Sequence, residues 1–460
     1  MQRQRSGIRA LLLTALLLAC QLPVGAEATP EQHQQPLKEL KTPKGLLKGR
    51  SFSDLIQLPQ WMELSLAWMS EPMGNTAGGT VRSVSTINQL SIDLAFGAGL
   101  RNTSQASSEW ERWQGRLSLA HLSGQPPFFN EQIGVLFPTQ ELVTINSGFW
   151  LQGIWLERQG DTLSLQLGPN LPMQSLFSAP VYNFYVNYTI NGSLNLDLPG
   201  YPIAPANALG GNASWQFNPQ FSLHYGAYQL NKQRGGVDSA LWKGWRFNVA
   251  GDDGIVQAFR LDWALDPKAE RPLMACESSS KPRRYLRHQA DCSQPVALDN
   301  MLPDPLLQLG GIAGSWRFPQ LRNNKRWENT ANTAFAHANL PLKLPIGHGS
   351  RIWASGAYGF EPAINAVPTF VEGGLLIQGV MPHRPLDVLV LGASRSGLSP
   401  YSRGPNGERQ SYEAMVELDY ILQLSQNLQL QPGVQFVINP GGSGRVPGVI
   451  APGVQISLNW

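Results

Sequence analysis

Apolar and polar residues alternate over short stretches that recur from about residue 62 to the end of the chain. In the last stretch Val454, Ile456, Leu458 and Trp460 share one face of an extended strand, and the residues between them are polar. The same period of two recurs in stretches at residues 62–68, 89–96, 114–119, 162–167, 259–263 and 412–420. The pattern predicts many β-strands, each with one apolar and one polar face, and no helix between them.

The connections between these stretches are of two kinds. Tight turns are expected at Gly160-Asp161, at Asn218-Pro219 and at Gly251 to Gly254. Long connections rich in Pro, Gly and Asn are expected at residues 122–148, 170–212, 266–305 and 395–410. Together with strands that end on aromatic residues, this predicts an all-β fold: a transmembrane antiparallel β-barrel of about 16 strands with short periplasmic turns and long extracellular loops.

Composition supports a barrel and excludes two other classes of protein. Charged residues make up 15% of the chain, against about 25% in typical soluble proteins, while 42% of residues are hydrophobic. After the N-terminal segment no apolar run reaches about 18 residues, which excludes a helical membrane protein. A net charge of +3 over 460 residues gives no indication of nucleic-acid binding.

The N-terminus has the features of an export signal. Arg3, Arg5 and Arg9 precede an apolar segment at residues 10–19, and a cleavage site of the A-x-A type ends at Ala28. Cleavage two residues earlier is an alternative, and a lipobox that makes Cys20 a lipidated N-terminus is another. We therefore expect a signal peptide at residues 1–28, a polar periplasmic lead-in or linker at 29–57, and an outer-membrane barrel at 58–460.

Cys276 and Cys292 form an even pair in an exported chain, which predicts a disulfide that closes an extracellular loop; two free thiols are the alternative. The basic run from Lys281 to His288 lies between them. It could attract anions or bind the phosphates of lipopolysaccharide, or it could be an ordinary solvated loop tip.

Four stretches are similar to the carbohydrate-selective porin OprB family. They are Phe177 with the segment Asn183 to Asn187, residues 198–205 followed by Gly210 and Gly211, residues 413–420, and residues 430–442 with their Asn-Pro-Gly-Gly turn. The resemblance runs from about residue 58 to the C-terminus. The chain departs from the family pattern near its mature N-terminus, where residues 48–54 replace a Gly-Asp-Trp-Gly-Gly type of segment.

The resemblance implies a single-chain barrel of 16 strands in the outer membrane that passes sugars and similar small hydrophilic solutes by facilitated diffusion. It also implies that the barrel-assembly machinery recognises the strand ending at Trp460, and that outer-membrane lipid surrounds the barrel. A homotrimer and a monomer both remain open. The alternative function is an outer-membrane barrel with a mainly binding or hydrolytic role.

Polar side chains at a sugar-selective constriction exchange hydrogen bonds with hydroxyl groups, and aromatic rings stack on the apolar faces of the sugar. The strand phase predicts these pore-lining residues: Glu63, Asp93, Arg116, Arg260, Asp262, Arg351, Glu413, Glu417 and Asp419. Phe128, Phe129 and Phe137 are candidates for a constriction loop. Each of these residues could instead belong to a solvated wall that only stabilises the barrel. Arg260 and Asp262 lie two apart on one face and are expected to screen each other.

No catalytic pattern stands out. The seven histidines show no metal-ligand spacing, and nucleotide-loop and G-x-S-x-G motifs are missing from the sequence. We expect no enzymatic activity, no metal and no cofactor, although a Ser/His pair on adjacent strands would leave no trace in sequence.

Overall fold

The computed structural model divides the chain into two compact units, residues 1–40 and residues 41–460. The described residues all lie in the second unit: 52–98, 100, 109–124, 126–142, 147–171, 176–192, 207–230, 242–244, 251–265, 302–381, 383–425 and 427–460. The expected signal peptide, most of the lead-in, and both Cys276 and Cys292 lie outside them.

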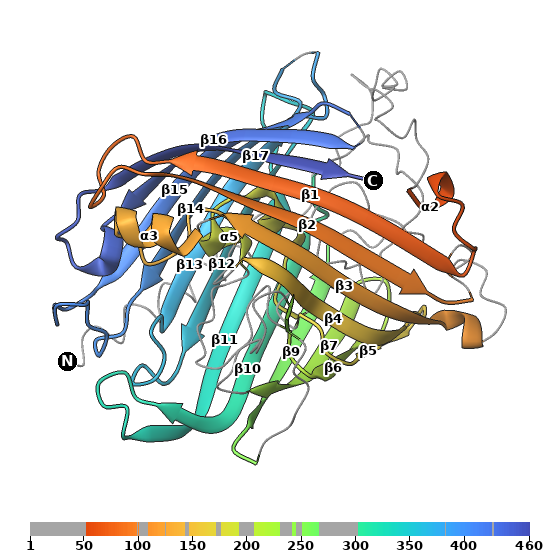
Figure 1. Cartoon of the computed structure of the whole chain (residues 1–460), viewed down its shortest axis with the longest axis horizontal. Helices are drawn as coiled ribbons and strands as arrows, with labels where there is room; N and C mark the ends of the chain where they lie inside the picture. The colour runs from red at the N-terminus through yellow and green to blue at the C-terminus, as the bar shows by residue number, and fades with distance from the viewer. Residues whose placement is uncertain are drawn as a thin grey trace. The chain divides into compact units, whose positions relative to one another are not determined.

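Sixteen antiparallel strands form a closed sheet, which confirms the predicted barrel (Figure 1). They are β1 Met62–Gly74, β2 Val84–Phe96, β3 Trp113–Gly124, β4 Gly148–Arg158, β5 Leu163–Leu167, β6 Gly210–Gln216, β7 Phe221–Leu230, β9 Gly254–Ala264, β10 Leu306–Pro319, β11 Trp327–Pro341, β12 Gly349–Gly359, β13 Thr369–Gln378, β14 Val388–Gly397, β15 Tyr412–Gln423, β16 Leu428–Ile438 and β17 Val449–Asn459. The two-residue β8, Trp242–Lys243, adds a parallel pairing to β4. Pairing of β1 with both β2 and β17 closes the ring.

In the described part of the chain, helices are few and short. They are α2 Phe52–Leu55, η2 Glu109–Arg112, α3 Pro126–Ile133, η3 Pro180–Phe184, α5 Tyr188–Asn191 and η5 Pro440–Gly442. Within the described residues, none of the helices has the length and apolar character needed to cross a membrane.

The alternating pattern places apolar side chains on the outer face of the strands. Leu391 and Leu418 are exposed there, whereas the residues beside them in sequence are buried or carry no side chain. Exposed aromatic rings lie near both ends of the strands, including Trp215 and Trp263 at one end and Trp327 at the other. This is the arrangement of a lipid-facing belt with aromatic girdles.

Because the strands alternate in direction, each connection can be assigned to one end of the barrel. The end where β1 begins and β17 finishes, here the terminal end, carries connections 97–112, 159–162, 217–220, 265–305, 342–348, 379–387 and 424–427. The opposite or distal end carries connections 75–83, 125–147, 168–209, 231–253, 320–326, 360–368, 398–411 and 439–448.

Two sequence predictions about the connections are wrong. Residues 266–305 were expected at the end opposite to the tight turns, yet the chain leaves β9 and enters β10 at the terminal end. There the Ala264 N–H donates to Gln220 of the tight turn 217–220 (2.7 Å). The expected tight turn at Gly251 to Gly254 instead lies at the distal end, just before β9. The number of strands that precede a connection determines the end of the barrel at which the connection lies, whereas the composition of the connection does not.

Two connections from the distal end fold into the barrel. The first inner segment is residues 126–142 and the second inner segment is residues 176–192. Side chains of the second segment, such as Phe177, Tyr182 and Tyr185, share one buried apolar cluster with inward-facing residues of the wall such as Trp353. Figure 1 draws α5, part of the second segment, within the ring of strands. The main hydrophobic core of this chain therefore lies inside the barrel.

Candidate functional site

An inward-facing carboxylate of β15 holds the second inner segment against the wall. Glu417 is fully buried and accepts hydrogen bonds from the backbone N–H groups of Val186 (2.7 Å) and Asn187 (3.2 Å). On the neighbouring strand β14, the Leu391 carbonyl accepts a hydrogen bond from the Tyr185 hydroxyl (3.0 Å). A carboxylate is a strong acceptor for backbone donors that have no strand or helix partner, which explains why an acid is buried here.

Glu413 lies four residues before Glu417 on β15, on the same face of the strand, and it performs the same role for the first inner segment. It accepts from the backbone N–H groups of Leu136 (2.9 Å) and Phe137 (3.1 Å), and from Gly441 (2.7 Å) in the connection 439–448. On β1 a third acid, Glu71, accepts from the Leu142 N–H (3.0 Å). Three carboxylates of the wall thus serve as acceptors for inner-segment backbone.

Amide and aromatic side chains complete the attachment of the second inner segment. Gln431 donates to the Phe184 carbonyl (2.8 Å) and to Asp419 (2.8 Å). The Trp353 indole donates to the Tyr185 hydroxyl (2.7 Å). Burial raises the pKa of Tyr185 well above its usual value, so its hydroxyl stays protonated and can donate in turn.

A buried cluster beneath Tyr182 contains a Ser/His pair. The Tyr182 hydroxyl lies 2.7 Å from the Ser355 hydroxyl, which lies 2.7 Å from Nδ1 of His337 on the neighbouring strand. Burial, followed by the nearby carboxylate of Glu372, raises the pKa of Tyr182 well above its usual value. Tyr182 covers the pair from inside the barrel, so the cluster fits the interior packing of the second inner segment.

The contacts described so far run to β1 and to β11–β16, whereas a different set of polar residues covers the inner face of β2–β6. We call this set the polar arc. It consists of Gln89, Ser91, Asp93, Gln114, Arg116, Ser118, Trp155, Glu157, Ser164, Gln166, Asn212 and Ser214.

Within the polar arc one aromatic ring, one acid and one base lie close together. The Trp155 indole donates to Glu157 (3.2 Å), the Arg116 guanidinium lies 3.6 Å from the same carboxylate, and it donates to Gln114 (3.0 Å). Neither Trp155 nor Arg116 is fully buried. A flat ring beside charged hydrogen-bonding groups is the combination that binds sugars, because sugars have apolar C–H faces and a rim of hydroxyl groups.

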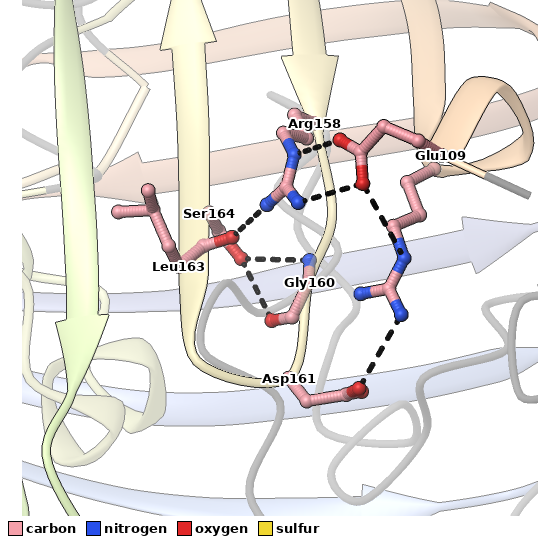
Figure 2. A network of polar contacts seen from close by, with 7 residues as sticks. Glu109, Arg158, Gly160, Asp161, Leu163 and Ser164 are labelled. Atoms are coloured by element: carbon pink, nitrogen blue, oxygen red, sulfur yellow. Dashed lines mark hydrogen bonds and ion pairs between the residues drawn. The ribbon is translucent and has the colours of Figure 1, made fainter.

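A second network fixes the rim beside this cluster at the terminal end (Figure 2). Arg158, at the end of β4, binds both carboxylate oxygens of Glu109 and donates to the Leu163 carbonyl (2.6 Å). Its hydrogen bonds lower the pKa of Glu109. Arg112 reaches Asp161 (3.6 Å) in the tight turn. The network connects η2 to the β4–β5 turn and so holds the strand ends that carry Arg116 and Glu157.

At the edge of the polar arc, β9 and β7 contribute a compact charge cluster. Arg260 forms two hydrogen bonds with Asp262 (2.8 and 3.0 Å), and Nε2 of His224 lies 3.4 Å from the same carboxylate. This confirms the expectation that Arg260 and Asp262 screen each other. Arg260 also reaches the Ser178 carbonyl of the second inner segment (3.5 Å).

The structure separates the sequence-predicted site residues into three groups. Glu63, Asp93, Arg116, Arg260 and Asp262 face inward on β1, β2, β3 and β9, in or beside the polar arc. Glu413, Glu417 and Asp419 face inward beneath the inner segments. Arg351 lies apart, near the terminal end, where it donates to the Pro303 carbonyl (2.6 Å). The pore-lining role of each remains a prediction.

One expectation about these residues is wrong. We expected Glu417 to stand in water, but its side chain is fully buried against backbone donors. Of the constriction candidates, Phe129 is buried in the interior core and Phe137 is half-buried, while the side chain of Phe128 lies outside the described part. Metal-binding groups of three or more His, Cys, Asp or Glu are lacking in the described part of the chain.

Sequence reasoning missed the second inner segment and the Trp155–Glu157 pair. The pair could have been found, because Ile154 and Leu156 alternate with it in the period of two. The path of the second inner segment has no such signal, since wall partners such as Ser355 and Glu417 lie more than 150 residues away in the chain.

Comparison with known structures supports the fold. The chain is similar to Pseudomonas putida OprB in a structure determined at high pH, with a TM-score of 0.71 and 15% identity over 90% of this chain and 99% of that one. A Salmonella typhi OmpF complex with daunomycin is less similar, with a TM-score of 0.49 and 9% identity over 87% of this chain and 97% of that one. Among proteins of curated function, none matches the sequence.

The sequence itself matches a family model. The model for the carbohydrate-selective porin OprB family covers residues 87–459, which span β2 to the last residue of β17 and include the polar arc and both inner segments. Together with the closed barrel, this match shows that the chain belongs to the carbohydrate-selective porin OprB family of the outer membrane.

Proposed function

We propose that sugars cross the barrel along the polar arc, and that Trp155, Glu157 and Arg116 recognise them there. The observation that carries this proposal is the grouping of one indole, one carboxylate and one guanidinium within 3.2–3.6 Å contacts on the inner wall. A sugar that loses water at this point would exchange its hydroxyl hydrogen bonds with Glu157 and Arg116 while one face stacks on Trp155.

The pairing of charges favours neutral solutes. Arg116 lies beside Glu157, and Arg260 beside Asp262, so each positive charge has a negative charge within 4 Å. Paired charges leave a weak net field, whereas a ring of one sign would select ions. Hydrogen-bonding capacity remains, because a guanidinium has five donors and a carboxylate several acceptor sites. The polar arc therefore suits polar, uncharged molecules. We also infer, as a separate point, that the protein is a channel and has no enzymatic activity.

We further propose that the distal end faces the outside of the cell and that residues 1–28 are an export signal. An exported chain reaches the outer membrane from the periplasm, and an even number of strands leaves the start of β1 and the end of β17 on one side. Tight turns 159–162, 217–220 and 424–427 also lie at the terminal end, as periplasmic turns do.

A transport assay tests the recognition proposal. Proteoliposomes would be compared for uptake of glucose and of sorbitol, which has six hydroxyl groups against five in the glucose ring form but no rigid ring. Trp155→Ala is expected to lower the glucose-to-sorbitol flux ratio severalfold, because the stacking surface is lost. The control is Trp110→Ala, a ring that is 76% exposed at the rim. An unchanged ratio in Trp155→Ala would count against the site.

The Ser355–His337 pair is the one observation that favours a hydrolytic role. Its 2.7 Å contact on adjacent strands matches a nucleophile and its base. However, Tyr182 shares the serine hydroxyl, and the pair is buried beneath the second inner segment. Purified protein that forms stepwise channels in a planar bilayer supports the porin function, whereas a silent barrel would favour this second role.

A further inference from the structure

The distal end of the barrel carries an excess of unpaired positive charge. Exposed cations lie on the hairpin between β10 and β11 and on the neighbouring rim: Arg317, Arg322, Lys325, Arg326, Arg395, Arg403 and Arg409. Within the described part of the chain, none of these seven forms an ion pair with a carboxylate.

Three acids of the same rim accept hydrogen bonds from neutral groups. Glu328 accepts from the Gln320 side chain (2.9 Å), Glu361 from the Asn332 side chain (2.8 Å), and Glu408 from the Asn406 N–H (2.9 Å). These carboxylates keep their charge, but the seven cations of this part of the rim outnumber its five acids, Asp252, Asp253, Glu328, Glu361 and Glu408, so its net charge is positive.

Two of these cations lie over aromatic rings on the outer face. The Arg317 guanidinium is 5.2 Å from the centre of the Trp327 ring, and Arg395 is 4.6 Å from the centre of the Tyr412 ring. Both pairs lie where the lipid-facing belt ends, the depth at which lipid headgroups begin. Stacking orders the guanidinium in this zone while its N–H groups remain available to an outside acceptor.

We propose that this outer surface, formed by the 316–327 hairpin and by Arg395 with Tyr412, binds the phosphate groups of the outer-leaflet glycolipid, lipopolysaccharide. A guanidinium matches a phosphate with two parallel hydrogen bonds, and the exposed rings contact the adjacent acyl chains. The choice of lipid rests on the proposed outward orientation of the distal end. The binding chemistry does not depend on transport.

The test uses the folded barrel in detergent, with diphosphorylated lipid A as the probe and native mass spectrometry as the measurement. Arg317→Gln combined with Arg395→Gln should weaken binding about tenfold at low salt, since each basic residue near a charged lipid surface contributes substantially. The control, Lys343→Gln with Arg384→Gln, removes two cations from the terminal-end connections 342–348 and 379–387 and should leave binding unchanged. Heat-modifiable migration on a gel confirms that each variant is folded.

Three results would overturn the proposal: unchanged binding in the distal variant, equal weakening in the control, or equal binding of lipid A stripped of its phosphates. Displacement of the probe by inorganic phosphate, with no requirement for acyl chains, would point to a free anion site and would also reject the lipid. Because sugar flux is not measured, these outcomes are independent of the Trp155 experiment.

Discussion

Buried carboxylates on β15 decide where the inner segments lie. Glu417 accepts two backbone donors that have no other acceptor in the barrel wall, and each such donor costs about 1–3 kcal/mol when buried without a partner. Glu417→Leu should therefore release the second inner segment while the barrel stays folded. We expect larger and noisier single-channel conductance and faster proteolysis between residues 176 and 192.

The neighbouring residue provides the control for that prediction. Leu418 faces outward and is 43% exposed, so Leu418→Lys places a charge in lipid, at a cost of roughly 2–4 kcal/mol near the midplane. This variant should lower the yield of folded barrel and leave the conductance of the folded fraction unchanged. Altered conductance in Leu418→Lys with normal folding, or an undisturbed channel in Glu417→Leu, would contradict the assignment of the two faces.

The residue scale also shows what sequence could predict. The inward or outward direction of a side chain follows from the period of two, because lipid requires apolar residues and the interior accepts polar ones. Asp93, Arg116 and Arg260 could therefore be placed on the inner face in advance. Whether such a residue contacts water or backbone could not be predicted, since the strand pattern around Glu417 gives no sign that the second inner segment covers it.

Among the elements, β17 completes the barrel, and Trp460, the residue that follows it, takes part directly. The Trp460 N–H donates to the Leu66 carbonyl on β1 (2.9 Å), and the Leu66 N–H donates back to Trp460 (3.3 Å). Deleting Trp460 removes both hydrogen bonds from the closing seam and one aromatic ring from the outer face. We expect less folded, heat-modifiable barrel in outer membranes. Trp460→Phe, which keeps the backbone pair and a ring, should restore most of it.

The strands could be predicted from the sequence, and the inner segments could not, for a physical reason. In a strand every residue contacts either lipid or the interior, so the alternation of environment appears as an alternation of apolar and polar residues. The inner segments have no repeating environment: Pro138 accepts from the backbone of Tyr188, and Thr139 accepts from Gln435 on β16. Their course depends on contacts between distant parts of the chain, so composition indicated an irregular loop at residues 122–148 without revealing what it would contact.

At the scale of the whole molecule, the end of the barrel at which a loop lies depends on whether an odd or an even number of strands precedes it, and not on the length or polarity of the loop. The connection 265–305 is long and polar, which suggested an extracellular loop, but β9 and β10 direct it to the end where β1 begins and β17 finishes. A single miscounted strand reverses every later connection. The sequence could therefore predict a 16-stranded barrel without assigning each loop to its end.

Orientation in the membrane is the property on which the lipid proposal depends, and cysteine labelling measures it. Asn324 lies in the exposed turn of the β10–β11 hairpin at the distal end, and Asp161 is exposed in a tight turn at the terminal end. With Cys276 and Cys292 replaced by serine, a membrane-impermeant maleimide should label Asn324→Cys on intact cells. It should label Asp161→Cys only after the outer membrane is permeabilised. The reverse result would place the arginine–aromatic pairs in the phospholipid inner leaflet, where lipopolysaccharide could not reach them.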